Sequence, residues 1–166
     1  KQRRDAELAL IKAATYDSLT GLANRRHFME LAKSALEQNT LVTAETYILM
    51  LDVDHFKSVN DRAGHAIGDK VLIAIASTLN KSVRRTDSVC RLGGEEFAII
   101  LPNTSEEDAL FVAEKIRTEV EQTEILGYTD IYGQVTISIG LAKAEDQQTI
   151  DVVLTHADKA LYLAKE

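Results

Sequence analysis

The segment RLGGEEFAIILP, Arg91 to Pro102, places two adjacent glycines between two apolar runs. Gly93 and Gly94 can adopt positive φ angles without steric cost, so the pair predicts a tight turn that joins two β-strands in a hairpin. Glu95 and Glu96 follow the turn directly. Strict alternation of side chains applies to regular strands and relaxes at the exit of a turn, so both carboxylates can face one site.

Two adjacent acids in front of a buried strand are unfavourable unless a cation lies near them. A divalent metal ion would meet that need. A solvated, acidic hairpin tip is the alternative interpretation, and it is the better one on these residues alone because short motifs often match by chance. The rest of the chain has to decide between the two.

Size and composition describe an ordinary soluble domain. With 166 residues, 45% of them hydrophobic and 27% charged, the chain can bury one full core. The net charge of −7 argues against non-specific binding to nucleic acid. The chain has a single cysteine, Cys90, no apolar run of the roughly 18 residues that a membrane span needs, and no signal-peptide pattern. These features predict a cytoplasmic protein, or the cytoplasmic domain of a membrane-bound sensor.

Residues 1–15 predict a charged helix with Leu8, Ile11 and Ala14 at helical spacing. We interpret this segment as a linker or stalk from an upstream sensor domain, with a two-helix seam and an ordinary capping helix as equal alternatives. Residues 16–166 form the predicted folded domain.

The pattern of the remaining residues predicts an α/β (α+β) fold with a mixed central sheet flanked by helices. Its elements are a helix capped by Asn24, a buried strand at Tyr47–Leu51, a helix at Gly64–Val83, the hairpin, a helix opened by a capping box of Thr104 and Glu107, a loop or small hairpin at Gly127–Gly133, a strand at Val135–Leu141 and a helix from about Ile150. A salt bridge to Asp17 is the expected role of Arg25 and Arg26.

Four segments stand out along the chain: GGEEF, DVDHFKSVNDRAGHAIGD at Asp52–Asp69, DSLTGLANRR at Asp17–Arg26 and ADKALYLAK at Ala157–Lys165. Together these segments resemble the GGDEF family of diguanylate cyclases. Their order along most of the chain makes the resemblance specific, although Glu95 stands where the family name has Asp. The resemblance implies a palm-like nucleotidyl cyclase fold and an enzyme that condenses two GTP molecules into cyclic di-GMP, with release of two pyrophosphates.

The resemblance also implies roles for the acids. Asp52, the carbonyl of Val53 and Glu95 are similar to the main metal ligands, and Glu96 is similar to a second ligand or to the group that deprotonates the 3′-hydroxyl. Two Mg²⁺ (or Mn²⁺) ions per active site are expected, since carboxylate oxygens suit hard cations and two ions can brace an in-line displacement.

Substrate contacts are implied in the same way. Asn60 and Asp69 resemble the guanine-reading residues, and carboxylate and amide groups can indeed pair with the donors and acceptors of guanine. The other expected substrate-binding residues are His55, Phe56, Lys57, Gly93, Gly94 and Lys165.

A second site and a partner complete the expectations. Arg84 and Asp87 fit the family's RxxD inhibitory motif, with help from Lys115, so product feedback at the surface is expected. One site holds one GTP whereas the product joins two, and a homodimer is therefore expected for catalysis. A non-catalytic module that senses cyclic di-GMP or GTP is the alternative function, and a mixed-dinucleotide synthase is a third.

Overall fold

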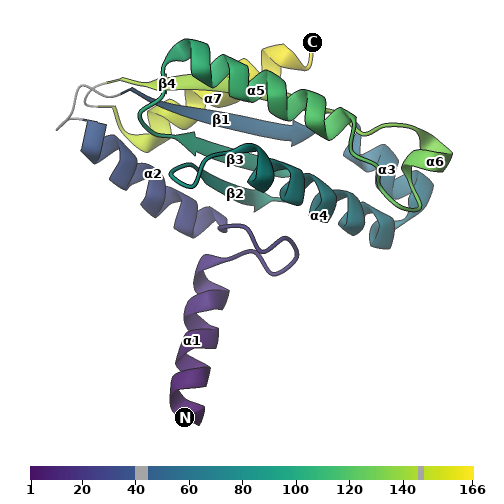
Figure 1. The fold of residues 1–166 in the computed structure, drawn as a ribbon, viewed down its shortest axis with the longest axis horizontal. Coiled ribbons are helices and arrows are strands. Elements are labelled where there is room, and N and C mark those ends of the chain that lie inside the picture. The colour runs from purple at the N-terminus through teal and green to yellow at the C-terminus, as the bar shows by residue number, and fades with distance from the viewer. Residues whose placement is uncertain (40–44, 146–147) are drawn as a thin grey trace.

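The computed structural model describes residues 1–39, 45–145 and 148–166 (Figure 1). Its elements are α1 (Gln2–Thr15), α2 (Arg25–Asn39), β1 (Thr46–Val53), α3 (Phe56–Ala63), α4 (His65–Ser82), β2 (Ser88–Gly93), β3 (Glu96–Leu101), α5 (Glu106–Glu121), α6 (Thr129–Tyr132), β4 (Ile137–Ala144) and α7 (Ile150–Ala164).

The strands form a four-stranded sheet in the order β2-β3-β1-β4. β1 lies inside it and pairs antiparallel with both β3 and β4. This position explains its uninterrupted apolar sequence, because a central strand with helices on both faces is buried on both sides. After β1 the chain passes through α3 and α4 to the edge strand β2. The hairpin that follows β2 places β3 between β2 and β1. The predicted class, a central sheet flanked by helices, is confirmed, but the sheet is antiparallel throughout and not mixed as predicted, because each of its three described strand pairs runs antiparallel.

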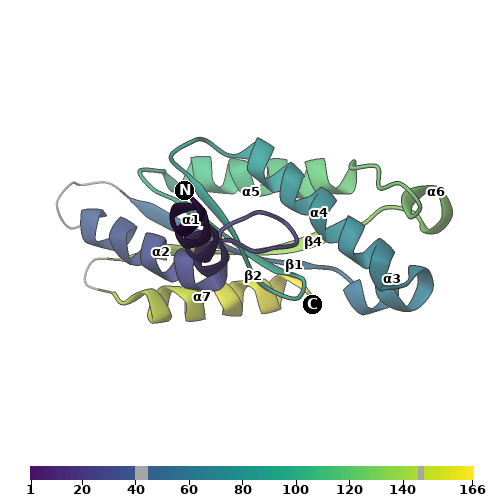
Figure 2. The ribbon, with the colours of Figure 1, turned by 90° about the horizontal axis from the view of Figure 1, so that it is seen from below.

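The two faces of the sheet carry separate hydrophobic clusters, as expected from the alternation of side chains along a strand. Leu49 and Leu51 of β1 pack with residues of α4 and α5. Ile48 and Met50 face the other way and pack with residues of α2 and α7. Figure 2 shows the two helical layers on opposite sides of the sheet. Cys90 is buried in the second cluster, and this burial raises the pKa of its thiol.

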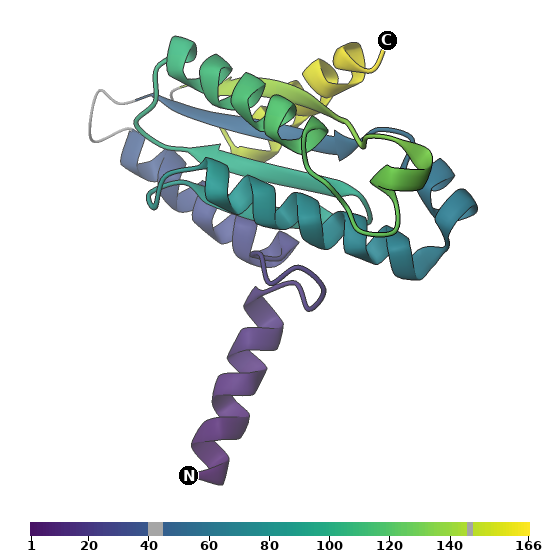
Figure 3. The ribbon, with the colours of Figure 1, turned by 45° about the vertical axis from the view of Figure 1, so that its right-hand side comes forward.

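Helix α1 projects away from the rest of the molecule (Figure 3) and has no buried residue. The predicted helix is confirmed. Its regularly spaced apolar side chains are exposed to solvent, with Leu8 57% and Ile11 55% accessible. Asn24 joins it to the domain, since its Nδ2 donates to the Ala14 carbonyl at 2.9 Å. Asn24 Oδ1 accepts from the backbone N–H of His27 at 2.9 Å, which confirms it as the N-cap of α2.

Two local predictions need correction, and one helix was not predicted at all. Phe56–Ala63 forms the unpredicted helix α3, and the predicted loop or small hairpin at Gly127–Gly133 contains the short helix α6. The cap of α5 is Ser105, whose side chain accepts from the Asp108 N–H at 3.2 Å, so the capping box of Thr104 and Glu107 was wrong. Among the helices of the described ranges, none combines the length and apolar character required to cross a membrane.

Candidate active site

Asp52 and Glu96 lie opposite each other on neighbouring strands. Asp52 is the next-to-last residue of β1, Glu96 is the first residue of β3, and the two are register partners in the antiparallel ladder. Both continue the alternation of Met50 and Ala98, so their side chains emerge on the face covered by α2 and α7. The sheet thus brings together two carboxylates that are far apart in sequence.

Negative charge accumulates around Glu96. Burial raises the pKa of its carboxyl, and the carboxylates of Asp52, Asp158 and Glu95 raise it further, with Arg25 acting in the opposite direction. Each of these neighbours makes ionisation of Glu96 less favourable, except the arginine. The acids therefore form an electrostatically strained group that a cation would relieve.

A cation of the chain itself already contacts this group. Lys165, which caps the C-terminus of α7, places its Nζ 2.6 Å from Asp52 Oδ1. The Asp52 side chain is 14% exposed, so this ion pair is partly shielded from water. The sequence predicted a triphosphate contact for Lys165, and in this structure its ammonium group lies on a predicted metal ligand instead.

Asp54, two residues beyond Asp52, has a structural role. Its Oδ2 accepts from Thr136 Oγ1 and its Oδ1 from Ser138 Oγ, both at 2.7 Å. These bonds tie the end of β1 to the start of β4. Because both oxygens of Asp54 are used in these bonds, Asp52 is the aspartate of this segment that belongs to the acidic group.

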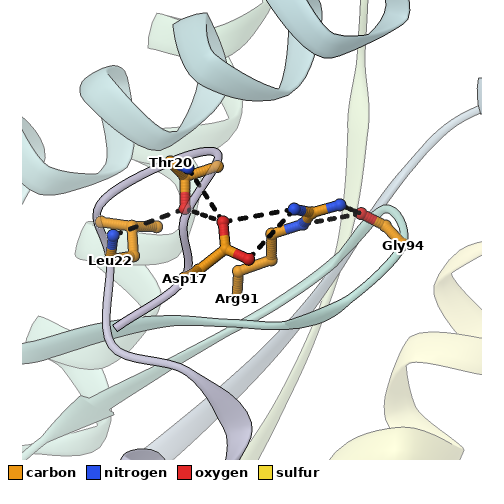
Figure 4. A network of polar contacts seen from close by, with 5 residues as sticks. All are labelled: Asp17, Thr20, Leu22, Arg91 and Gly94. Carbon is orange, nitrogen blue, oxygen red and sulfur yellow. Dashed lines mark hydrogen bonds and ion pairs between the residues drawn. The ribbon is translucent and has the colours of Figure 1, made fainter. Parts of the chain in front are cut away.

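The hairpin turn next to the acids is held by the side chain of Arg91, a residue of β2, which also binds the segment that follows α1 (Figure 4). Gly93 and Gly94 have φ angles of 147° and 51°, which confirms the predicted glycine turn. Arg91 donates to the Gly94 carbonyl through Nε at 3.0 Å and Nη2 at 2.8 Å. Its Nη1 lies 3.2 Å from both carboxylate oxygens of Asp17, so one guanidinium links the turn to the segment that follows α1.

Asp17 was expected to pair with Arg25 or Arg26, and that prediction was wrong. Besides Arg91, Asp17 Oδ2 accepts from Thr20 N at 2.9 Å and Thr20 Oγ1 at 2.7 Å. The pKa of Asp17 is lowered: burial alone would raise it, but the hydrogen bonds from Thr20 and Arg91 favour the ionised carboxylate more strongly. Arg26 instead lies 4.0 Å from Glu30, and Arg25 lines a cleft of about 350 Å³ together with Glu96.

The backbone after β1 turns sharply into α3. His55 has a φ of 55°, a left-handed conformation that non-glycine residues seldom adopt and that recurs at functional sites. Phe56 begins the helix and is buried, whereas Lys57 is exposed. The first N–H groups of a helix have no partner within it and favour anions, so this end of α3 offers donors next to the acidic group.

Asn60 and Asp69 carry free polar groups. Within the described ranges, neither the Asn60 amide nor the Asp69 carboxylate makes a hydrogen bond or ion pair with another residue, and neither is buried without a partner. Asn60 lies on α3 and Asp69 on α4, two helices that pack against each other. Both side chains are therefore available to a ligand.

Comparison with known proteins agrees with this geometry. The family model described as "Diguanylate cyclase, GGDEF domain" matches residues 14–166. The chain belongs to the GGDEF family. It is 40% identical over 164 residues to the diguanylate cyclase DgcM of Escherichia coli strain K12, covering 99% of this chain and 39% of that protein. It is 41% identical over 160 residues to the response regulator PleD of Caulobacter vibrioides, covering 93% and 35%. The chain thus spans well under half the length of these curated relatives.

Solved structures give the same family. The coiled coil and GGDEF domain of DgcB from Caulobacter crescentus, in complex with c-di-GMP, superposes with a TM-score of 0.88 at 31% identity, covering 99% of this chain and 87% of that one. The diguanylate cyclase SiaD of Pseudomonas aeruginosa, in complex with its activator SiaC, has a TM-score of 0.84 at 38% identity, covering 99% and 63%.

In the RxxD segment of this GGDEF domain, Arg84 and Asp87 bind each other. The Arg84 guanidinium contacts Asp87 at 3.0 Å, the Pro102 carbonyl at 3.1 Å and Thr104 Oγ1 at 2.6 Å. The Arg84 side chain is 54% exposed, but that of Asp87 is 1% exposed, which corrects the expectation that both lie open at the surface. Lys115 stands apart on α5, with Nζ 4.0 Å from Glu119.

Sequence reasoning missed three contributors to the site of this GGDEF domain. Arg91 and its pairing with Asp17 join segments that only the fold brings together. Arg25 and Asp158 act on the charge of Glu96 from α2 and α7. Asp158 lies within the ADKALYLAK segment and could have been found there, but nothing in the sequence ties Arg25 to the acids.

Proposed function

We propose that this GGDEF domain is a diguanylate cyclase that condenses two GTP molecules into cyclic di-GMP. The observation that carries the proposal is the register pairing of Asp52 with Glu96, beside Glu95 and the free α3 N-terminus. Acids gathered at one end of a sheet, next to helix N–H groups, suit the phosphates of a nucleotide held through cations. Family membership supports the same reaction.

The acidic group fits hard dications, although within the described residues no three His, Cys, Asp or Glu side chains are gathered closely enough to hold an ion as they stand. The strained ionisation of Glu96 and the Lys165 ammonium on Asp52 both support a cation site. We assign Asp52, the Val53 carbonyl, Glu95 and Glu96 as ligands of two Mg²⁺ or Mn²⁺ ions. When bound, these ions would neutralise phosphate charge and polarise the α-phosphate.

The residues of the chain bind and orient GTP. The N–H groups at His55 and Phe56 and the ammonium of Lys57 receive the triphosphate, with Gly93 and Gly94 letting it approach the backbone. The Lys165 ammonium, which contacts Asp52 at 2.6 Å, would be free to contact a phosphate if Asp52 held a cation. The free groups of Asn60 and Asp69 meet the guanine edge, and adenine would leave the Asp69 carboxylate unpaired.

Proton transfer is assigned to Glu96. Its carboxylate stands opposite Asp52 in the ladder, where it would accept the proton of the 3′-hydroxyl that attacks the α-phosphate. Since each domain supplies one GTP, two protomers must face each other, and activity should rise faster than linearly with protein concentration. Strict proportionality would contradict the dimer.

Product feedback is proposed at Arg84, Asp87 and Lys115. Arg84 presents an exposed edge, and a cyclic dinucleotide phosphate would exchange with its internal partners Pro102 and Thr104. Arg84→Ala should relieve inhibition by added cyclic di-GMP. Unchanged inhibition in that variant would remove this part of the proposal. We further propose residues 1–15 as a linker from an upstream sensor domain and the cytoplasm as the location.

The decisive experiment is incubation of the protein with GTP and Mg²⁺, followed by chromatography for cyclic di-GMP. Asp52→Asn should lower product formation by about 100-fold or more, because it removes a charge from the cation site. Asp5→Asn makes the same chemical change on exposed α1 and should leave activity intact. Binding of cyclic di-GMP without any synthesis at high protein concentration would instead establish the sensor module.

A further inference from the structure

Gly68 occupies a place in α4 where any side chain would strike Asn60. A Cβ atom built on Gly68 would lie 1.9 Å from Asn60 Oδ1 and 3.1 Å from its Cγ. Its next neighbour, Phe56 Cζ, would be at 3.5 Å, an ordinary contact distance. The amide of Asn60 therefore uses the space that a side chain at position 68 would fill.

The backbone does not require this glycine. Gly68 lies inside helix α4 and does not have a positive φ, unlike Gly64 before the helix with φ 85°. Glycine in a helix interior is less favourable than alanine. The chain therefore has a residue at position 68 that is unfavourable for a helix, and the close approach of the Asn60 side chain explains why it is glycine.

The kind of clash separates this site from a packing glycine. At Gly140 a Cβ would lie 2.1 Å from the backbone N of Leu161, which cannot move without displacing α7. At Gly68 the obstruction is the end of one side chain, which can rotate. A side chain at 68 would consequently change where the Asn60 amide points while leaving the two helices in place.

We propose that Gly68 is a positioning residue for base recognition. It lets the Asn60 amide lie against α4, one residue away from the free carboxylate of Asp69, so that both groups can meet one guanine. This inference rests on the proposed function, in which Asn60 and Asp69 read the base. It assigns the geometry of that recognition to a glycine that touches neither substrate nor metal.

The test uses Gly68→Ala and two nucleotides that bind without reacting, 3′-deoxy-GTP and 3′-deoxy-ATP, with Mg²⁺ and calorimetric titration. Loss of one aligned hydrogen bond should weaken 3′-deoxy-GTP binding by about 10-fold. Binding of 3′-deoxy-ATP should change much less, so selectivity falls. With GTP as substrate, KM should rise by a larger factor than kcat falls. A purely structural role would not alter base selectivity.

A double-mutant cycle supplies the matched control. In an Asn60→Ala background the obstruction is gone, so adding Gly68→Ala should change neither affinity nor selectivity further. An equal loss in both backgrounds would overturn the inference. If Gly68→Ala alone fails to fold, the double variant should fold, and failure of both would show that packing against α4 is the reason for the glycine.

The outcome also distinguishes this inference from the function on which it rests. Wild-type protein that binds both nucleotides equally, or neither, would refute guanine recognition and with it the role of Gly68. Guanine-selective wild-type protein whose selectivity survives Gly68→Ala would refute only the role of Gly68.

Discussion

Replacing Arg91 with alanine tests the link between the acidic turn and the segment after α1. The change removes the hydrogen bonds at 2.8 and 3.0 Å to the Gly94 carbonyl and the contacts at 3.2 Å to Asp17. The two side chains are 15% and 21% exposed, so the ion pair is largely shielded from water. The Asp17 carboxylate would keep its two hydrogen bonds from Thr20.

The size of the effect follows from that partial burial. Removing one partner from a fully buried pair costs roughly 3–5 kcal/mol, and exposed pairs contribute about 0–1 kcal/mol. For a pair between these limits, with a carbonyl acceptor lost as well, we expect Arg91→Ala to lower the free energy of unfolding by about 2–4 kcal/mol. For a domain of this size that corresponds to a fall in Tm of roughly 5–15 °C.

Chemical denaturation and thermal melts measure the change, with Arg85→Ala as the matched control. Arg85 is exposed and makes no hydrogen bond or ion pair in the described part of the chain, so its loss should change the unfolding free energy by about 0.5 kcal/mol or less. Combining Arg91→Ala with Asp17→Asn should cost clearly less than the sum of the single changes. Equal effects of the two arginines, or strict additivity with Asp17→Asn, would refute this reasoning.

Three further outcomes are expected. Because the pKa of Asp17 is lowered in the folded protein, its ionised carboxylate contributes stability above about pH 4 that is lost as the pH falls below that value, and Asp17→Asn should flatten this part of the pH profile of unfolding. Gly140→Ala would place a Cβ 2.1 Å from Leu161 N and should destabilise the domain by roughly 3 kcal/mol in urea titrations, and wild-type stability would contradict the contact. Lys165→Met removes the ammonium from Asp52 and should strengthen Mg²⁺ binding without nucleotide by about 3- to 10-fold in calorimetry, whereas weaker binding would show that Lys165 does not compete with the ion.

Much of the fold was accessible from the sequence because its signals are local. The apolar run of β1, the glycine turn before β3 and the apolar spacing of α4 and α7 depend on neighbouring residues, and each predicted element is present. Helix α3 was missed because its eight residues follow β1 directly and carry few apolar positions. The cap of α5 was misplaced by one residue since Thr104 and Ser105 are chemically alike as caps.

The site was predictable where acids follow strand ends and unpredictable where partners come from distant segments. Resemblance named Asp52, Glu95 and Glu96, and the ladder brings Asp52 and Glu96 together. No sequence pattern indicates that Arg91 binds Asp17, because the choice among the nearby arginines depends on the path of the turn. The burial of Asp87 beneath Arg84 also arises only from the folded chain.

Glu95 and Glu96 are adjacent in sequence but differ in what fixes them. Glu96 belongs to the ladder, so inserting one residue between Glu96 and Phe97 would move its side chain off the face that it shares with Asp52. Glu95 lies in the turn between the two strands, and its carbonyl accepts from Val53 N of β1 at 3.3 Å. A residue outside the ladder can accommodate one methylene more of side-chain length without a change of strand register, and this explains how the chain accommodates glutamate where the family name has aspartate.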